Sequence, residues 1–258
     1  MSDKEIKKEY SKRRRILKLR YKYNTRKLKR ENAEKLESFY LENEDKRPKN
    51  PPKRPLLQEI GNSISHGIGS VFAIVSLVLM LVYSETPRER VGAVIYFVGM
   101  FVMFTASCLY HAFKHGTAVK RLFRRFDYSS IYLMIGATFA PVLLVHFEGT
   151  FGTVFFIIQW AVIALGISLV GVFGPAKLRF IHIPLYVVLG WSALMLMPGM
   201  LGDKFAMAMW ILAGGILYSI GIIPYAIKYK SSHFIWHIFV VLGALAQWIG
   251  IFTYLYLV

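Results

Sequence analysis

The feature that most constrains this chain is a series of long apolar runs that begins near residue 60 and continues to the C-terminus. Hydrophobic residues make up 55% of the 258 residues, and most charges outside the N-terminal region fall in the gaps between the runs. A run of about 20 apolar residues is long enough for a helix to cross the hydrocarbon core of a bilayer, which is roughly 30 Å thick. The sequence therefore predicts an all-α membrane protein, a bundle of seven transmembrane helices.

The expected spans are Ile60–Tyr83, Val91–His111, Asp127–His146, Gly152–Phe173, Ile181–Pro198, Phe205–Ile227 and His233–Leu257. Stretches such as Val154–Ala164 are apolar on every face, which is not the in-and-out alternation of a β-barrel strand. Cys108 is the single cysteine, so no intrachain disulfide can form.

The distribution of positive charge predicts the orientation of the bundle. Residues 1–58 hold 20 Lys or Arg against 9 Asp or Glu, and every second loop after them is also basic. The basic loop residues are Lys114, Lys120, Arg121, Arg124, Arg125, Lys177, Arg179, Lys228 and Lys230. Because cytoplasmic loops carry an excess of Lys and Arg, we expect the N-terminus in the cytoplasm and the C-terminus outside a cell (plasma) membrane.

Residues 1–55 are expected to form a basic cytoplasmic tail with a Pro-rich linker, and residues 56–258 to form the seven-helix membrane domain. The tail could lie as a helix on anionic lipid headgroups, or it could be a solvated, partly disordered segment whose charge only enforces the topology. The sequence leaves both alternatives open. We do not expect nucleic-acid binding, because no nucleic-acid fold or motif surrounds the basic run.

Polar residues inside the spans are candidates for a functional site, because they are costly in lipid and usually face the bundle interior or a cavity. They are Glu59, Asn62, Ser65 and His66 at the first span, Ser107 and His111 in the second, Asp127 in the third, and His233 and His237 in the last. With the orientation above, all of them lie at the cytoplasmic ends of their helices.

Two histidines four residues apart, such as His233 and His237, present their rings on one helical face, the spacing that helical zinc sites use. A third histidine such as His111 would complete three nitrogen ligands and leave one position for a water whose pKa falls toward about 7. Asp127 could act as a general base or ligate directly. Ser107 could hydrogen-bond that carboxylate or a developing oxyanion.

Each residue taken alone also has a plainer interpretation. The histidine pair could anchor a helix at the interface, Ser107 could bond back to its own helix, and Asp127 could cap a helix. His115, His146 and His182 lack a partner of matching spacing, and we do not expect them to bind a metal. Only the combination favours a metal site, and iron, copper or nickel would accept the same ligands as zinc.

In this order the motifs resemble those of the hemolysin III family, the bacterial branch of the progestin and adipoQ receptor superfamily, which includes the adiponectin receptors. The likeness covers roughly residues 56–258. It rests on Glu59, Asn62, Ser65 and His66 in the first span, Ser107 to His111 as SxxxH, Asp127 with Tyr128, and His233 to His237 as HxxxH.

The resemblance implies a seven-helix fold distinct from G-protein-coupled receptors, with zinc bound near the cytoplasmic face by His111, His233 and His237. Asp127 matches the position that holds the zinc water, and Ser107 matches the neighbouring serine. Glu59, Asn62, Ser65 and His66 are expected to surround the site without ligating the metal. The long basic tail departs from many bacterial relatives, so the likeness says nothing about residues 1–55.

Three functions follow from this resemblance as alternatives. The superfamily is similar to alkaline ceramidases, which favours a zinc-dependent intramembrane hydrolase of a lipid amide or ester, with a substrate whose acyl chain enters from the bilayer. The second alternative is a non-enzymatic protein of membrane lipid homeostasis or sensing, in which zinc is structural. The third is a pore-forming cytolysin, which the family name suggests, although no span carries a continuous polar stripe to line a pore.

Overall fold

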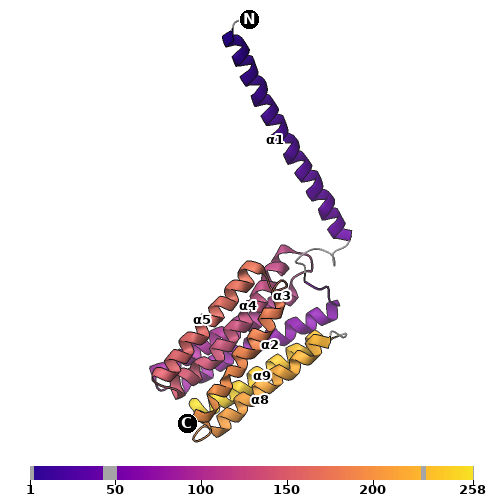
Figure 1. The fold of residues 1–258 in the computed structure, drawn as a ribbon. Helices are drawn as coiled ribbons and strands as arrows, with labels where there is room; N and C mark the ends of the chain where they lie inside the picture. The colour runs from indigo at the N-terminus through magenta and orange to yellow at the C-terminus, as the bar shows by residue number, and fades with distance from the viewer. Residues whose placement is uncertain (1–2, 43–50, 228–230, 258) are drawn as a thin grey trace. The chain divides into compact units, whose positions relative to one another are not determined.

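A computed structural model describes residues 3–42, 51–227 and 231–257 of the chain. All regular elements within these ranges are helical, and Figure 1 shows their arrangement within the bundle. The chain divides into two units, Met1–Pro52 and Lys53–Val258. Lys228 and Lys230, which belong to the expected basic loops, lie outside the described residues, as do residues 43–50 of the expected tail and linker.

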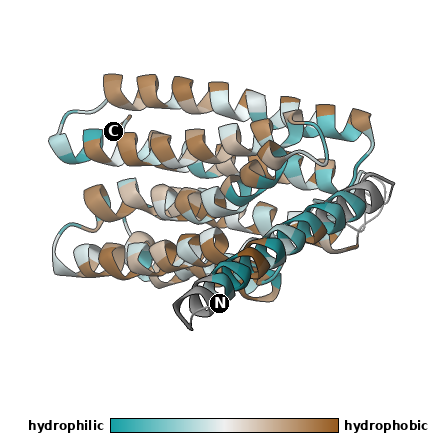
Figure 2. Ribbon diagram, turned by 90° about the horizontal axis from the view of Figure 1, so that it is seen from above, coloured by the Kyte–Doolittle hydropathy of each residue, from teal (hydrophilic) through white to brown (hydrophobic). Residues whose placement is uncertain are grey.

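The first unit contains one helix, α1, Asp3–Glu42, which is 40 residues long. Figure 2 shows it as mostly hydrophilic along its coloured part, in contrast to the helices of the second unit. Ion pairs one turn apart, Arg13 with Glu9 at 3.2 Å and Lys27 with Glu31 at 3.9 Å, support the helix locally. The described part of the tail is therefore helical, and its association with anionic lipid stays a prediction.

The second unit is a bundle of helices from Leu56 to Leu255. Its elements are α2 (Leu56–Val82), α3 (Pro87–Ala112), α4 (Ala118–Pro141) with a π-helical turn (Val142–His146), α5 (Thr150–Phe173), α6 (Arg179–Trp191) with a 3₁₀ turn (Ser192–Met195), α7 (Met197–Met200), α8 (Phe205–Ile227) and α9 (Ser232–Leu255). In the described part of the chain, six helices are long and apolar enough to cross a membrane: α2, α3, α4 with its π-helical turn, α5, α8 and α9.

The expected fifth span, Ile181–Pro198, differs from these six. Its counterpart is a shorter apolar helix, Arg179–Met195, in which α6 passes into a 3₁₀ turn. The run contains Pro184 and is followed by Pro198, and proline removes a backbone donor from the helical ladder. The predicted end of this helix at Pro198 was therefore wrong, while its role as a membrane span stays a prediction.

The predicted start of the third span at Asp127 was also wrong. Helix α4 begins nine residues earlier, at Ala118, where the Thr117 hydroxyl accepts a hydrogen bond from the Lys120 backbone N–H at 3.2 Å. That N-cap starts the helix inside the basic segment. Lys120, Arg121, Arg124 and Arg125 are therefore helical residues rather than loop residues, and Asp127 lies in the third turn instead of capping the helix.

Neighbouring helices pack in the order α5, α4, α3, α2, α9, α8, and the short α6 contacts α4, α5 and α8. Small residues allow close approach at several crossings. Gly99 of α3 packs against Ala137 of α4, and the ring of Tyr218 from α8 packs against Gly243 of α9. Because successive long helices run in opposite directions, the start of α2, the end of α3 and the starts of α4 and α9 meet at one end of the bundle (Figure 1).

Candidate metal centre

Three histidine side chains meet at this end of the bundle. His111 comes from the last turn of α3, and His233 and His237 come from the first two turns of α9. The Nε2 atoms of His111 and His233 are 3.2 Å apart, as are those of His233 and His237. Among the described residues, these three form a group whose ligand atoms lie within 4.8 Å of one another.

These distances fit a metal ion. A tetrahedral site with metal–nitrogen bonds of 2.0–2.1 Å places its nitrogen ligands about 3.3 Å from one another. The side chains of His111 and His237 are buried and that of His233 is partly buried, so three nitrogen lone pairs converge in a site poor in solvent. The three histidines could therefore hold a metal ion.

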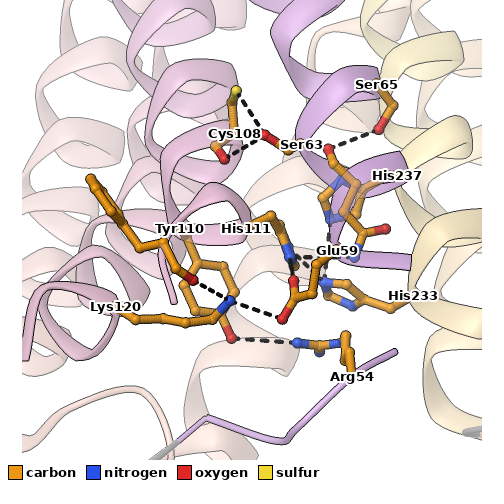
Figure 3. Close-up of polar contacts among 12 residues, drawn as sticks. Arg54, Glu59, Ser63, Ser65, Cys108, Tyr110, His111, Lys120, His233 and His237 are labelled. Atoms are coloured by element: carbon orange, nitrogen blue, oxygen red, sulfur yellow. Dashed lines mark hydrogen bonds and ion pairs between the residues drawn. The ribbon is translucent and has the colours of Figure 1, made fainter. Parts of the chain in front are cut away.

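Glu59 sets the orientation of His111. Its Oε2 atom is a close hydrogen-bond partner of His111 Nδ1 (Figure 3). The amide nitrogen of Asn62 lies 3.3 Å from the same ring atom. When Nδ1 carries the proton and donates it to a carboxylate, Nε2 keeps its lone pair and faces the other histidines. A carboxylate that orients the imidazole in this way is a recurrent feature around metal ligands.

The other two residues expected around the site behave differently. His66 is buried and stacks on the ring of His237, with ring centroids 3.7 Å apart, so it supports that ring by packing. The Ser65 hydroxyl instead donates to the Asn62 carbonyl oxygen at 3.0 Å within its own helix. Ser65 is thus placed beside the site in sequence, and its hydrogen bond is local.

Two charged residues near the site were not predicted from the sequence. Lys120 is buried and donates to Glu59 Oε1 at 2.8 Å, and Arg54 donates to the Tyr110 hydroxyl at 3.4 Å (Figure 3). Burial lowers the pKa of the Arg54 guanidinium, but the nearby Tyr110 hydroxyl and Glu59 carboxylate outweigh this and raise it. The sequence signal for Lys120 was its position three residues after Thr117, a helix-capping residue type.

Asp127 and Ser107 lie on a cavity of about 200 Å³ that runs from the histidines into the bundle. Ser107 comes from α3 and Asp127 from α4. His66, His233 and His237 line the same end of the cavity. The remaining lining is mostly apolar and comes from α3, α4, α6, α8 and α9, so the cavity joins a polar end to a hydrophobic interior.

The histidines that were not expected to bind a metal are engaged elsewhere. His146 Nε2 lies 3.2 Å from the Gly199 carbonyl oxygen, and His182 Nδ1 lies 2.9 Å from the Tyr132 hydroxyl. Neither belongs to the histidine group described above, and nor does His115.

The chain is similar to one protein family and to several proteins from bacteria and mammals. The family described as Haemolysin-III related matches residues 55–248. The chain is 32% identical over 205 residues to "Hemolysin-3" of Bacillus cereus, an alignment that covers 76% of this chain and 91% of that protein. It is 31% identical over 205 residues to "Hemolysin-3 homolog" of Bacillus subtilis, covering 76% and 94%. It is also 27% identical over 220 residues to the human "Monocyte to macrophage differentiation factor", covering 81% and 90%.

Proposed function

The chain belongs to the Haemolysin-III related family, and we propose that it is a zinc-dependent membrane hydrolase that cleaves an amide or ester bond of a lipid. The observation that carries this proposal is the convergence of three histidine Nε2 atoms at the polar end of an apolar cavity. Three nitrogen ligands with one open position are the usual set of catalytic zinc sites.

The proposed topology has seven spans in a cell (plasma) membrane, with the metal site and α1 on the cytoplasmic side. The 13 residues of α6 and the four of its 3₁₀ turn have a combined rise of about 28 Å, close to the roughly 30 Å of hydrocarbon. Seven spans put the two chain ends on opposite sides. The excess of Lys and Arg before α2 and around the starts of α4 and α6 supports a cytoplasmic N-terminus.

The proposed chemistry divides between the metal and the two residues beside it. His111, His233 and His237 would hold a zinc ion, which would supply Lewis acidity and lower the pKa of a bound water toward about 7. Asp127 accepts the proton of the attacking water and returns it to the leaving amine or alcohol. We assign Ser107 to hydrogen-bonding this base or the developing oxyanion, because it lines the same cavity as Asp127.

The apolar part of the cavity suits the acyl chain of a lipid substrate. Ile131 and Ile135 of α4, Val187 of α6 and Ile211 of α8 line it, with Asp127 at the polar end. A substrate that enters from the bilayer would place its carbonyl group near Asp127 and its chain among these residues. Water would arrive from the cytoplasmic end.

A bound lipid surface is the proposed partner of α1. The helix carries the basic run Arg13, Arg14, Arg15, Lys18 and Arg20, and the side chains of this run are exposed. Each basic residue held near an anionic cytoplasmic leaflet contributes about 1 kcal/mol to binding. We therefore assign α1 to anionic headgroups.

A second function has one observation in its favour. The histidines join α3 to α9, with His111 and His233 122 residues apart in sequence, and a structural metal would hold these helices together. In this alternative the protein acts in lipid sensing or membrane homeostasis without turnover. We place a pore-forming cytolysin last, because the cavity lining is mostly apolar.

One experiment separates hydrolase from structural metal. Purified protein is analysed for zinc by mass spectrometry and incubated with a ceramide and with a lipid ester, with fatty-acid release as the readout. We expect about one zinc per chain, turnover in the wild type, and loss of turnover with zinc retained in Asp127→Asn. His237→Ala should lose both, while the matched control His146→Ala keeps both. Unchanged turnover in Asp127→Asn would refute the proposed mechanism, and zinc without any lipid product would favour the structural alternative.

A further inference from the structure

Lys120 is a buried lysine that contacts His111 through Glu59, the carboxylate that bonds the Nδ1 atom of this candidate metal ligand. Lys120 is 1% exposed, and its Nζ atom donates to Glu59 Oε1 at 2.8 Å and to the Phe113 carbonyl oxygen at 3.0 Å. The same Glu59 carboxylate uses its other oxygen, Oε2, for His111 Nδ1. Figure 3 shows Glu59 between the lysine and the histidine.

The position of Lys120 is unfavourable for a cation unless it has a specific partner. It is the third residue of α4, where the exposed N–H groups and the helix dipole favour negative charge. It is also removed from solvent, and an unpaired buried ammonium is costly. Glu59 supplies the compensating charge, so the two residues are placed as a pair.

The pair leaves the Glu59 carboxylate little freedom. One oxygen is held by Lys120 of α4 and the other by His111 of α3, while the residue itself sits in the first turn of α2. A carboxylate fixed at both oxygens cannot rotate toward the cavity. It therefore remains a partner of Nδ1 and does not compete for the metal.

We propose that Lys120 is a positioning residue of the metal centre, which holds Glu59 on His111 Nδ1 so that Nε2 faces the metal and the fourth coordination position stays open. This inference rests on the proposed function. Without the ammonium, the Glu59 charge would be drawn toward the divalent cation and away from Nδ1. His111 would then lose its fixed tautomer, and partners of this kind typically change metal affinity by about tenfold to a hundredfold.

A purely structural role for Lys120 predicts a different outcome. Its bond to the Phe113 carbonyl oxygen closes the turn between α3 and α4, so loss of the side chain would lower stability even without metal. Metal affinity of the folded protein would then stay the same. Measuring the affinity and the stability of the metal-free protein separately distinguishes the two roles.

The experiment compares Lys120→Met, Lys120→Arg and the matched control Lys204→Met in detergent-purified full-length protein. Lys204, in the turn just before α8, also donates to a carbonyl oxygen, that of Tyr254 of α9 at 2.8 Å, away from the histidines. Zinc affinity is measured by competition with a chromophoric chelator. We expect zinc to bind Lys120→Met about tenfold to a hundredfold more weakly, with Lys120→Arg restoring most of the loss and Lys204→Met unchanged.

A second pair of variants keeps the test decisive if Lys120→Met fails to fold. Glu59→Gln removes the carboxylate charge alone. The double variant Glu59→Gln with Lys120→Met removes both charges and so leaves no unpaired buried charge. If Lys120 acts through Glu59, the two variants bind zinc equally well. A double variant that binds about tenfold more weakly than Glu59→Gln alone would overturn the inference.

Cobalt gives a spectroscopic readout of the same claim. The visible absorption of Co²⁺ is strong in a four-coordinate site and weak when an additional oxygen ligand enters. We expect the wild-type spectrum to be four-coordinate and that of Lys120→Met to weaken as Glu59 joins the ion. Wild-type zinc affinity in Lys120→Met would contradict only this inference, whereas a wild-type chain that binds no metal would contradict the proposed function itself.

Discussion

The packing of α3 against α4 sets the positions of the two helices that carry His111 and Asp127, and substitution of Gly99 tests it. A methyl group added at Gly99 would overlap the Ala137 methyl group and lie 3.0 Å from the Leu133 carbonyl oxygen. Neither atom belongs to a flexible side chain. Gly99→Ala therefore has to push the two helices apart.

The magnitude follows from a comparison with a second glycine. Gly215→Ala adds the same methyl group within a helix where nothing lies within 4 Å. Both substitutions gain about 1 kcal/mol of helix propensity, so the difference between them isolates the overpacking, which typically costs about 1–3 kcal/mol. This corresponds to a melting temperature roughly 2–12 °C lower for Gly99→Ala than for Gly215→Ala.

Cys108 supplies the assay, because it is the single cysteine of the chain and is partly shielded in the fold. Its reaction with a thiol-reactive fluorophore during heating reports unfolding in detergent. The double variant Gly99→Ala with Ala137→Gly removes the main overlap and should recover most of the loss. Equal melting temperatures for Gly99→Ala and Gly215→Ala would show that α3 and α4 do not pack this closely at Gly99.

Three further predictions concern the site and the tail. Zinc at a hundred times its dissociation constant should raise the free energy of unfolding of the wild type by about 2.7 kcal/mol, and His233→Ala should lose this stabilisation. Thermal unfolding with and without a chelator measures the difference. Ser107→Ala should lower lipid turnover without loss of zinc, because it removes the hydroxyl proposed to assist Asp127 or the oxyanion in the cavity. Equal turnover would rule out that role. The double variant Arg14→Gln with Arg15→Gln should weaken the association of α1 with anionic vesicles by about 1 kcal/mol per residue, measured by the emission of a probe attached to α1. Binding that does not depend on vesicle charge would contradict the assignment of α1 to anionic headgroups.

Much of the bundle was predictable because a membrane span needs a long apolar run, and such runs can be read from one sequence. The predicted Phe205–Ile227 is α8 without change, and α9 begins one residue before the predicted His233. The ends of α4 and α6 were less predictable. A capping threonine placed the start of α4 among basic residues, and prolines with a 3₁₀ turn shortened α6, effects that hydropathy does not register.

The grouping of the three histidines was predicted from their spacing and from the orientation of the spans. His233 and His237 share a helical face by their four-residue step, and alternate direction of the spans brings His111 to the same end. The convergence of their Nε2 atoms follows in the structure. The hydrogen bond of Glu59 to His111 and the stacking of His66 on His237 depend on rotamers and helix rotation, which the spacing does not determine.

The sequence by itself determined the membrane class of this protein, its apolar spans and the set of residues from which a metal site could be built, because these depend on composition and on the period of the helix. Only the tertiary structure decided which of those residues touch. It brought Lys120 of α4 to Glu59 of α2 and left Ser65 bonded to its own helix. The reason is physical: contacts between helices depend on how each one is rotated and how closely it approaches its neighbour, and those are set by packing of the whole bundle.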